Sequence, residues 1–330
     1  FGLASSDVMN AGGNFTTGGD LTLDADSWTN SGVIQAGTLN VNIKDFTQTA
    51  TGQLLASTAF LGTGDTWVND GVVGSDGTLG LKLTGAYSGS GRMSSLAELK
   101  MNAAQLDLGA PASITGGGKT EVNVIGQLNN YGRLTSGSDM TVTAAGLANY
   151  GALAASQDLV INAETILNDQ AEDGSRGFIF SGRNMSLQAG NLKNRYADIY
   201  TLGNLIVTGT TPGSSGQSLE NSSGSIEAGG DINVDVTSFV NQRDKFSMEQ
   251  VVVGGFMTMS CVQHCDGPES PRVRGPVFIY KTVESTVSVD SPMATFVSGH
   301  NLTVNSTSVL NQYSLLSAAN DLSITSTNIT

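Results

Sequence analysis

Cysteine and histidine, the residue types best suited to redox chemistry and metal binding, meet at one place in the sequence. The segment Cys261-Val262-Gln263-His264-Cys265 holds both cysteines of the chain and one of its two histidines. Zinc sites normally use four ligands, and this segment offers three at a spacing that matches no common zinc motif. A disulfide between Cys261 and Cys265 requires the backbone to turn back between them. We predict that disulfide and no metal site; a partial metal site and free thiols are the alternatives.

Residues for acid–base catalysis are sparse. The second histidine, His300, occupies a turn position where other copies of a repeat carry Asp, Arg or Ala. Parallel β-helices include polysaccharide lyases and hydrolases, whose sites gather acidic and basic groups on one solvent face. Here Asp20, Asp139, Asp158 and Asp231 stand instead at equivalent repeat corners, which predicts a structural role. We therefore predict no catalytic residue and no cofactor, and keep a carbohydrate-active enzyme as an alternative function.

Composition and charge narrow the classes of partner. The chain has 330 residues, of which 39% are hydrophobic and 13% charged, and its formal net charge is −14. That charge argues against nucleic acid and anionic lipid surfaces as partners. No run reaches the ~18–20 apolar residues that span a membrane, so we expect no membrane insertion by this segment. The chain begins at Phe1 rather than Met, and we expect a segment of a longer, exported protein.

A short phrase recurs along most of the chain and should position all of these residues. It consists of a polar turn followed by apolar, polar and apolar residues, and neighbouring copies lie mostly about 20 residues apart. The copies are centred on Leu21, Leu39, Leu79, Leu99, Val122, Met140, Leu159, Met185, Leu205, Ile232, Leu302 and Leu322. Period-two alternation places the apolar residues of each copy on one face of a short β-strand.

A second phrase, centred on Asn, lies between the copies. Examples are Trp28-Thr29-Asn30, Leu128-Asn129-Asn130-Tyr131-Gly132 and Leu147-Ala148-Asn149-Tyr150-Gly151. Asn and Gly suit tight corners, and Asn side chains on successive turns can hydrogen-bond as ladders. The two phrases predict an all-β fold, a right-handed parallel β-helix (solenoid) of about 14 turns with strands about 4.8 Å apart.

One step breaks the repeat. The copies at Ile232 and Leu302 are 70 residues apart, so about 50 residues have been inserted at one corner. We expect β-helix repeats over 1–242 and 293–330, and an inserted β-hairpin flap with the cysteine pair over 243–292. The strands of the hairpin are predicted at Gln250–Cys261 and Val277–Val289, with a Pro-rich tip between them.

The insertion is where function could be added to the scaffold. Aromatic residues, Met and Arg are favoured at protein interfaces. The candidate receptor contacts are Phe256, Met257, Met259, Arg272, Arg274, Phe278 and Tyr280. The alternative is a purely structural hairpin that shields a sheet and prevents edge-to-edge association.

The repeats resemble those of filamentous haemagglutinin. The resemblance rests on the Asn-corner phrase and the strand phrase that follows it, from Leu128 to Val142, and it extends over nearly the whole chain. The insert, with Phe239–Phe246, Gly255–Cys261 and nearby Cys265, resembles a segment of CdiA-type contact-dependent growth inhibition proteins.

The resemblance implies a secreted filament on the surface of a Gram-negative bacterium, exported by two-partner secretion through an outer-membrane transporter. It implies an internal, non-catalytic, monomeric stalk that binds an outer-membrane protein receptor on a target bacterium, with a C-terminal toxin outside this chain. An adhesin that binds a host-cell glycan or protein is the alternative implied by the repeats alone.

Overall fold

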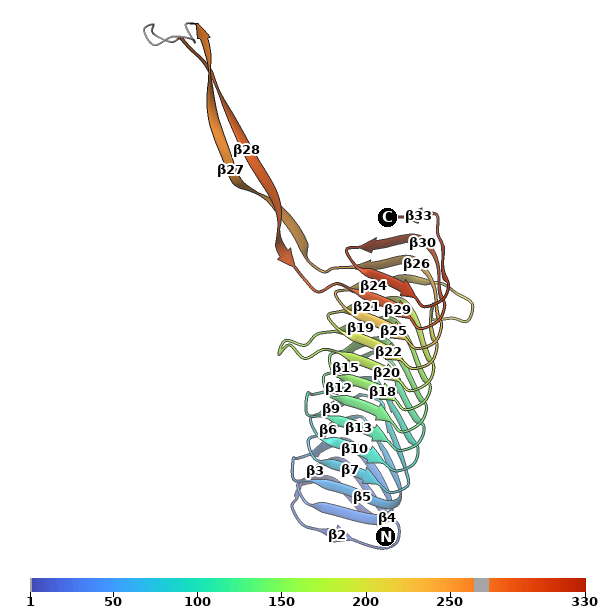
Figure 1. Ribbon diagram of the computed structural model, residues 1–330. Helices are drawn as coiled ribbons and strands as arrows, with labels where there is room; N and C mark the ends of the chain where they lie inside the picture. Colours follow the sequence, from blue (N-terminus) through green and yellow to red (C-terminus); the bar gives the residue numbers. More distant parts are fainter. Residues whose placement is uncertain (1, 264–272) are drawn as a thin grey trace. The chain divides into compact units, whose positions relative to one another are not determined.

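The computed structural model of the protein describes residues 2–263 and 273–330. It divides into two compact units, residues 1–242 with 292–330 and residues 243–291. The first unit is built from short parallel strands that coil around a common core (Figure 1). The described residues form no helix. The predicted all-β parallel solenoid is therefore confirmed.

The strands of the first unit lie on three sides of the coil. Seven strands run over the first and second sides: β1 (Gly2–Ala11), β3 (Leu21–Asn30), β17 (Met140–Asn149), β19 (Leu159–Asp169), β21 (Met185–Arg195), β26 (Ile232–Gln242) and β30 (Leu302–Gln312). Two strands begin on the third side: β4 (Val33–Gln48) continues over the first and second sides, and β5 (Gln53–Gly64) continues over the first side.

The remaining strands each occupy one side. The first side adds β8 (Thr78–Leu83), β11 (Leu99–Ala103), β14 (Thr120–Val124), β23 (Leu205–Thr208) and β32 (Leu322–Thr325). The second adds β6 (Thr66–Asn69), β9 (Ala86–Gly89), β12 (Gln105–Leu108), β15 (Gln127–Asn130), β24 (Gly216–Ser222) and β33 (Asn328–Ile329). The third comprises β2 (Phe15–Thr16), β7 (Val72–Ser75), β10 (Arg92–Ser95), β13 (Ser113–Gly116), β16 (Arg133–Ser136), β18 (Ala152–Ala155), β20 (Phe178–Ser181), β22 (Asp198–Thr201), β25 (Ser225–Ala228), β29 (Thr295–Ser298) and β31 (Leu315–Ala318).

The register of the first side follows the repeat that the sequence predicts. One column takes a residue from each of fourteen successive strands: Leu3, Leu23, Val41, Gly62, Leu81, Met101, Val122, Val142, Ile161, Leu187, Val207, Val234, Val304 and Ile324. Ile232 pairs directly with Leu302 although 70 residues separate them. The solenoid thus continues in register across the insertion.

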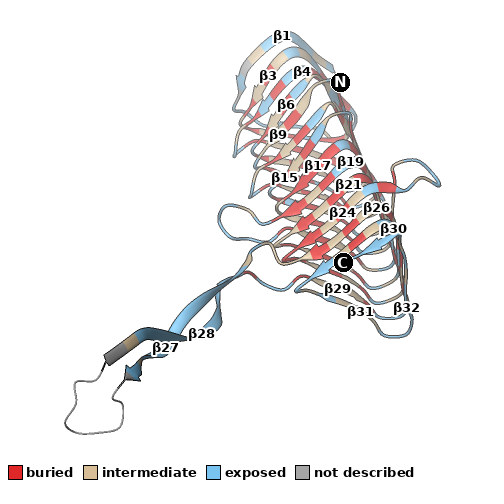
Figure 2. Ribbon diagram, turned by 90° about the horizontal axis from the view of Figure 1, so that it is seen from above, coloured by how far each residue is buried: buried red, intermediate tan, exposed pale blue. Residues whose placement is uncertain are grey.

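The core is a continuous stack of apolar side chains inside the coil. Along β14 and β15 the burial alternates, so that Val122, Val124 and Leu128 are buried while their polar neighbours are partly exposed. The inward residues form the buried stripe of Figure 2. Burying a Leu or Val side chain in this way contributes about 1.5–3 kcal/mol.

A ladder of buried amides runs along the end of the second side. Each Asn Nδ2 donates to the Oδ1 of the next turn, from Asn130 to Asn149 and from Asn149 to Asn168, both at 2.7 Å. The ladder continues through Asn194, Asn221, Asn241 and Asn311 at 2.8–2.9 Å. These side chains also bond backbone carbonyls, which satisfies buried polar groups at the corner.

The amide ladder has one break. A shorter run of Asn30, Gln48 and Asn69 ends where Asn69 Nδ2 donates to the Tyr87 hydroxyl at 3.0 Å. The next two positions are Gly89, where an added Cβ would lie 2.1 Å from the Asn69 carbonyl oxygen, and Leu108. Leu108 pairs with Asn130 but has no amide to donate, and Asn130 Oδ1 is buried without a hydrogen-bond partner.

Three of the corner aspartates connect successive turns through hydrogen bonds. The side-chain oxygen of one corner residue accepts the backbone N–H of the equivalent residue one turn later. This holds from Asp139 to Asp158 at 3.1 Å, from Asp158 to Asn184 at 3.0 Å, and from Asp231 to Asn301 at 3.0 Å. These carboxylates therefore organise the turns.

The second unit is one antiparallel hairpin. It pairs β27 (Phe246–Gln263) with β28 (Val273–Asp290). Both strands extend beyond the predicted Gln250–Cys261 and Val277–Val289, because Phe246 pairs with Asp290 near one end and Gln263 with Val273 at the other. The added residues are Phe246–Glu249, Val262 and Gln263 in β27, and Val273–Pro276 and Asp290 in β28. Several of them, such as Glu249, Gly275 and Pro276, are of types depleted in strands, so residue type alone places the strand ends too early.

Candidate functional site

The hairpin strands bring most of the predicted contact residues together. Phe256 pairs with Tyr280, and their rings stack with centroids 4.7 Å apart and planes 17° from parallel. Thr258 and Phe278 form the pair two residues further along. Side chains two residues apart in a strand share a face, so these four residues make one aromatic face.

The opposite face of the hairpin is aliphatic. Met257 pairs with Ile279, and Met259 pairs with Val277. Each of these positions is one residue away from the aromatic pairs, which places its side chain on the other side. The predicted contacts therefore lie on two faces with different chemistry, a distinction that residue type alone did not reveal.

Both faces are exposed. Phe256 is 64% exposed, Met257 68% and Ile279 64%, whereas core residues of the rod, such as Leu128, are fully buried. Further exposed apolar residues, which the sequence reasoning did not select, are Met248, Val251, Val252, Val253, Val283, Val287 and Val289. Consecutive apolar residues in a strand are the signal that both faces are apolar, and Val251-Val252-Val253 carries it.

The remaining predicted site residues are Arg272, Arg274 and the cysteine pair. Arg274 lies in β28 opposite Cys261. Arg272 and Cys265 lie outside the described residues, as does His264. The role of all seven candidate residues in receptor contact and the Cys261–Cys265 disulfide stay predictions.

The base of the hairpin is held by polar contacts. The Arg243 guanidinium forms an ion pair with Asp290, donates to the Ser291 carbonyl at 3.0 Å and lies over the Phe246 ring at 5.5 Å. Ser291 and Lys245 exchange hydrogen bonds, since Lys245 N–H donates to Ser291 Oγ and Ser291 N–H to the Lys245 carbonyl, both at 2.9 Å. These contacts fix the start and the end of the insert beside each other.

The outer surface of the rod carries one compact group of opposite charges on the first side. Glu121 bonds Lys119 at 2.6 Å and Lys100 at 3.2 Å. The hydrogen bond from Lys119, followed by that from Lys100, lowers the pKa of Glu121. A general acid needs a raised pKa, so the shift is in the wrong direction for glycoside hydrolysis.

The remaining candidates for chemistry have structural positions. His300 is exposed in the bend between β29 and β30, where its backbone N–H donates to Ser298 Oγ at 3.2 Å. Within residues 2–263 and 273–330, no three His, Cys, Asp or Glu side chains lie close enough to hold a metal ion. The same residues include no helix long and apolar enough to cross a membrane.

Comparison with known proteins places the repeats in a family. The haemagglutinin repeat matches residues 2–59, 97–150, 147–247 and 288–330. The "Deoxyribonuclease CdiA" of Dickeya dadantii (strain 3937) is 29% identical over 268 residues, a match that covers 68% of this chain and 8% of that protein. The chain thus spans less than a tenth of this relative. No solved structure matches the chain.

Proposed function

Because the chain belongs to the haemagglutinin-repeat family, we propose that it is an internal stalk segment of a secreted filament and that its hairpin binds a receptor. The filament lies on the surface of a Gram-negative bacterium after export by two-partner secretion. The receptor is an outer-membrane protein of a target bacterium. The relative is named a deoxyribonuclease, and in this proposal a toxin activity belongs to a part of the longer protein outside these repeats.

The observation that carries this proposal is an apolar hairpin inserted into a rod that is regular without it. On the third side of the coil, Ser225 pairs directly with Thr295, and on the first side Ile232 pairs with Leu302. The turns before and after the insert therefore pair with each other in register. The 49 residues of the second unit, 243–291, are not needed to continue the coil.

Exposed apolar side chains favour binding over a shielding role. A two-stranded hairpin is marginally stable in water by itself, and large exposed apolar patches mark interaction sites. Phe256, Phe278 and Tyr280 supply the aromatic groups that dominate binding energies at interfaces. A receptor that covers one or both faces would remove this surface from water.

The direct test replaces the insert by a corner that the protein already contains. In the preceding turn, Ser223-Gly224 joins β24 to β25. Because Ser222 pairs with Gln242 and Ser225 with Thr295, a Ser-Gly dipeptide can replace Arg243–Ala294. We expect a folded rod by circular dichroism that no longer binds target cells. Unchanged binding by this folded variant would place the receptor site elsewhere.

Paired substitutions then identify the face that binds. One variant carries Phe256→Ser and Tyr280→Ser, and its matched counterpart carries Met257→Ser and Ile279→Ser, so the two differ only in the face altered. Removing a central aromatic pair should weaken binding by at least tenfold, which corresponds to about 1.4 kcal/mol. Equal binding by both variants and the wild type would count against the hairpin as the receptor-binding site. Binding to glycans or host cells, with none to bacteria, would favour the adhesin alternative.

A further inference from the structure

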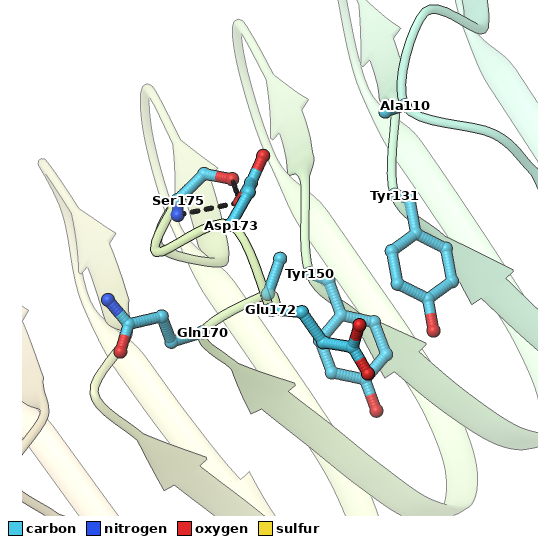
Figure 3. A pocket seen from close by; sticks show the side chains of 8 residues that line it. Ala110, Tyr131, Tyr150, Gln170, Glu172, Asp173 and Ser175 are labelled. Atoms are coloured by element: carbon cyan, nitrogen blue, oxygen red, sulfur yellow. Dashed lines mark hydrogen bonds between the residues drawn. The ribbon is translucent and has the colours of Figure 1, made fainter.

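A surface cleft lies on the rod at the corner after the second side. Its volume is about 430 Å³, and it is lined by Ala110, Tyr131, Tyr150, Gln170, Ala171, Glu172, Asp173 and Ser175. Figure 3 shows these side chains on successive turns of the coil, with the tyrosines beside the loop that follows β19. In the sequence, Tyr131 and Tyr150 are recognisable only as neighbours of the corner asparagines.

The wall of the cleft is a pair of stacked tyrosines. Tyr131 and Tyr150 follow Asn130 and Asn149 of the buried ladder, and their ring centroids are 4.7 Å apart with planes 12° from parallel. The preceding turn has Gly109 at the position equivalent to Tyr131 and contributes only the small Ala110 to the cleft lining. Tyr131 is consequently 48% exposed and offers π-electron surface to a ligand.

The opposite wall is an ordered loop. Ala171 N–H donates to the Ser175 carbonyl at 2.8 Å, Gly174 N–H donates to the Ala171 carbonyl at 3.0 Å, and Gln170 Nε2 donates to the Gly174 carbonyl at 2.7 Å. The Ser175 backbone N–H and hydroxyl both donate to Asp173. The loop is thus held by its own hydrogen bonds, and a ligand would meet a preorganised site.

The cleft has a net negative charge. Two arginines lie close to the loop, but Arg176 pairs with Asp198 at 2.9 Å and Arg195 pairs with Asp169 at 2.9 Å. The lining itself holds Glu172 and Asp173 and no basic residue. The hydrogen bonds from Ser175 lower the pKa of Asp173, so this carboxyl is ionised at neutral pH.

We propose that this cleft binds a primary alkylammonium group on an aliphatic stem. The π-faces of Tyr131 and Tyr150 attract a cation and pack against methylene groups, while the Glu172 carboxylate accepts hydrogen bonds from the ammonium. A free polyamine and a lysine side chain of a protein share this chemistry. The uncompensated carboxylates disfavour an anion and select a cation over a neutral sugar.

Isothermal titration calorimetry of the whole chain at low ionic strength tests the proposal. The probes are spermidine, a short peptide with one lysine, the same peptide with that lysine acetylated, and methyl glucoside. We expect saturable binding of spermidine or the lysine peptide and none of the acetylated peptide. Tighter binding of spermidine would indicate a free polyamine as the source, and tighter binding of the peptide a protein lysine.

Three substitutions and a control locate the binding. Glu172→Gln and Tyr131→Leu should each weaken the affinity by roughly threefold or more, whereas Tyr131→Phe, which keeps the ring, should retain it. Asp26→Asn removes one exposed carboxylate of β3, which contributes nothing to the cleft lining, and should leave affinity unchanged. Binding lost equally in Asp26→Asn, binding of methyl glucoside alone, or no saturable binding by the wild type would overturn the proposal.

Discussion

The rod and the hairpin use the same kind of secondary structure in opposite ways. In the rod, apolar residues alternate with polar ones, and the apolar set is buried inside the coil. In the hairpin, apolar residues occupy consecutive positions, and both faces are exposed. Burial in the core accounts for the apolar residues of the rod, whereas those of the hairpin are not used to build that core. The difference separates substitutions that should unfold the protein from substitutions that should leave its fold intact.

The largest expected effect compares two aliphatic truncations. Leu128→Ala removes a fully buried side chain and should lower the free energy of unfolding by about 3 kcal/mol. Ile279→Ala removes a side chain that is 64% exposed and should change it by less than about 0.5 kcal/mol. Urea denaturation followed by circular dichroism measures both. A similar loss for the two would mean that the hairpin is part of the cooperative core.

The next comparison concerns polar side chains. Asn168→Ala removes an amide that links Asn149 to Asn194, leaving buried partners unsatisfied, and should cost about 2 kcal/mol. Ser247→Ala removes one partner of an exposed Ser247–Ser288 contact in the hairpin and should have almost no effect. The same denaturation series measures both variants. A cost for Asn168→Ala no greater than that for Ser247→Ala would show that the ladder contributes little.

A smaller effect distinguishes two leucines of one strand. Leu106 and Leu108 are both buried in β12, but only Leu108 precedes Asn130 in the amide column. Leu106→Asn and Leu108→Asn should both destabilise the rod. Leu108→Asn should cost about 1 kcal/mol less, because the new amide can donate to the unpaired Asn130 Oδ1. Equal costs in thermal unfolding would argue against the ladder as the reason for that position.

The smallest effect involves the outer surface of the rod. Substitutions there should change stability as little as substitutions in the exposed hairpin do. Glu121 has a pKa lowered by its two lysine partners, so its contribution to stability is present above its unfolded-state pKa and is lost as pH falls through the folded-state value. Glu121→Gln should change stability at neutral pH by at most about 0.5 kcal/mol after solvent screening. Unfolding measured against pH and salt checks this. A large loss that persists in high salt would indicate an unscreened, buried role.

How far the sequence predicts the structure also differs between the two regions. The recurring phrase predicts the strand register of the rod, including the pairing of Ile232 with Leu302. It does so because alternate residues of a strand point to opposite faces, and the apolar set must face inward. In Val251-Val252-Val253 the residues on both faces of the strand are apolar, so the pattern does not show which face would be buried. The tyrosine cleft is not evident from the sequence for another reason. Ala110, Tyr131 and Glu172 meet only once turns of unequal length are stacked.

The buried amides of the rod all point the same way. From Asn130 to Asn241, every Nδ2 donates to the Oδ1 of the next turn toward the C-terminus, and Asn311 is the last acceptor. Aligned amide dipoles add head to tail and polarise one another, as peptide dipoles do in an α-helix. The amide ladder is therefore a small electrical dipole inside a β-structure, with its negative pole at the unpartnered Asn130 Oδ1. Reversing one amide would oppose its neighbours on both sides, so the whole column shares a single orientation.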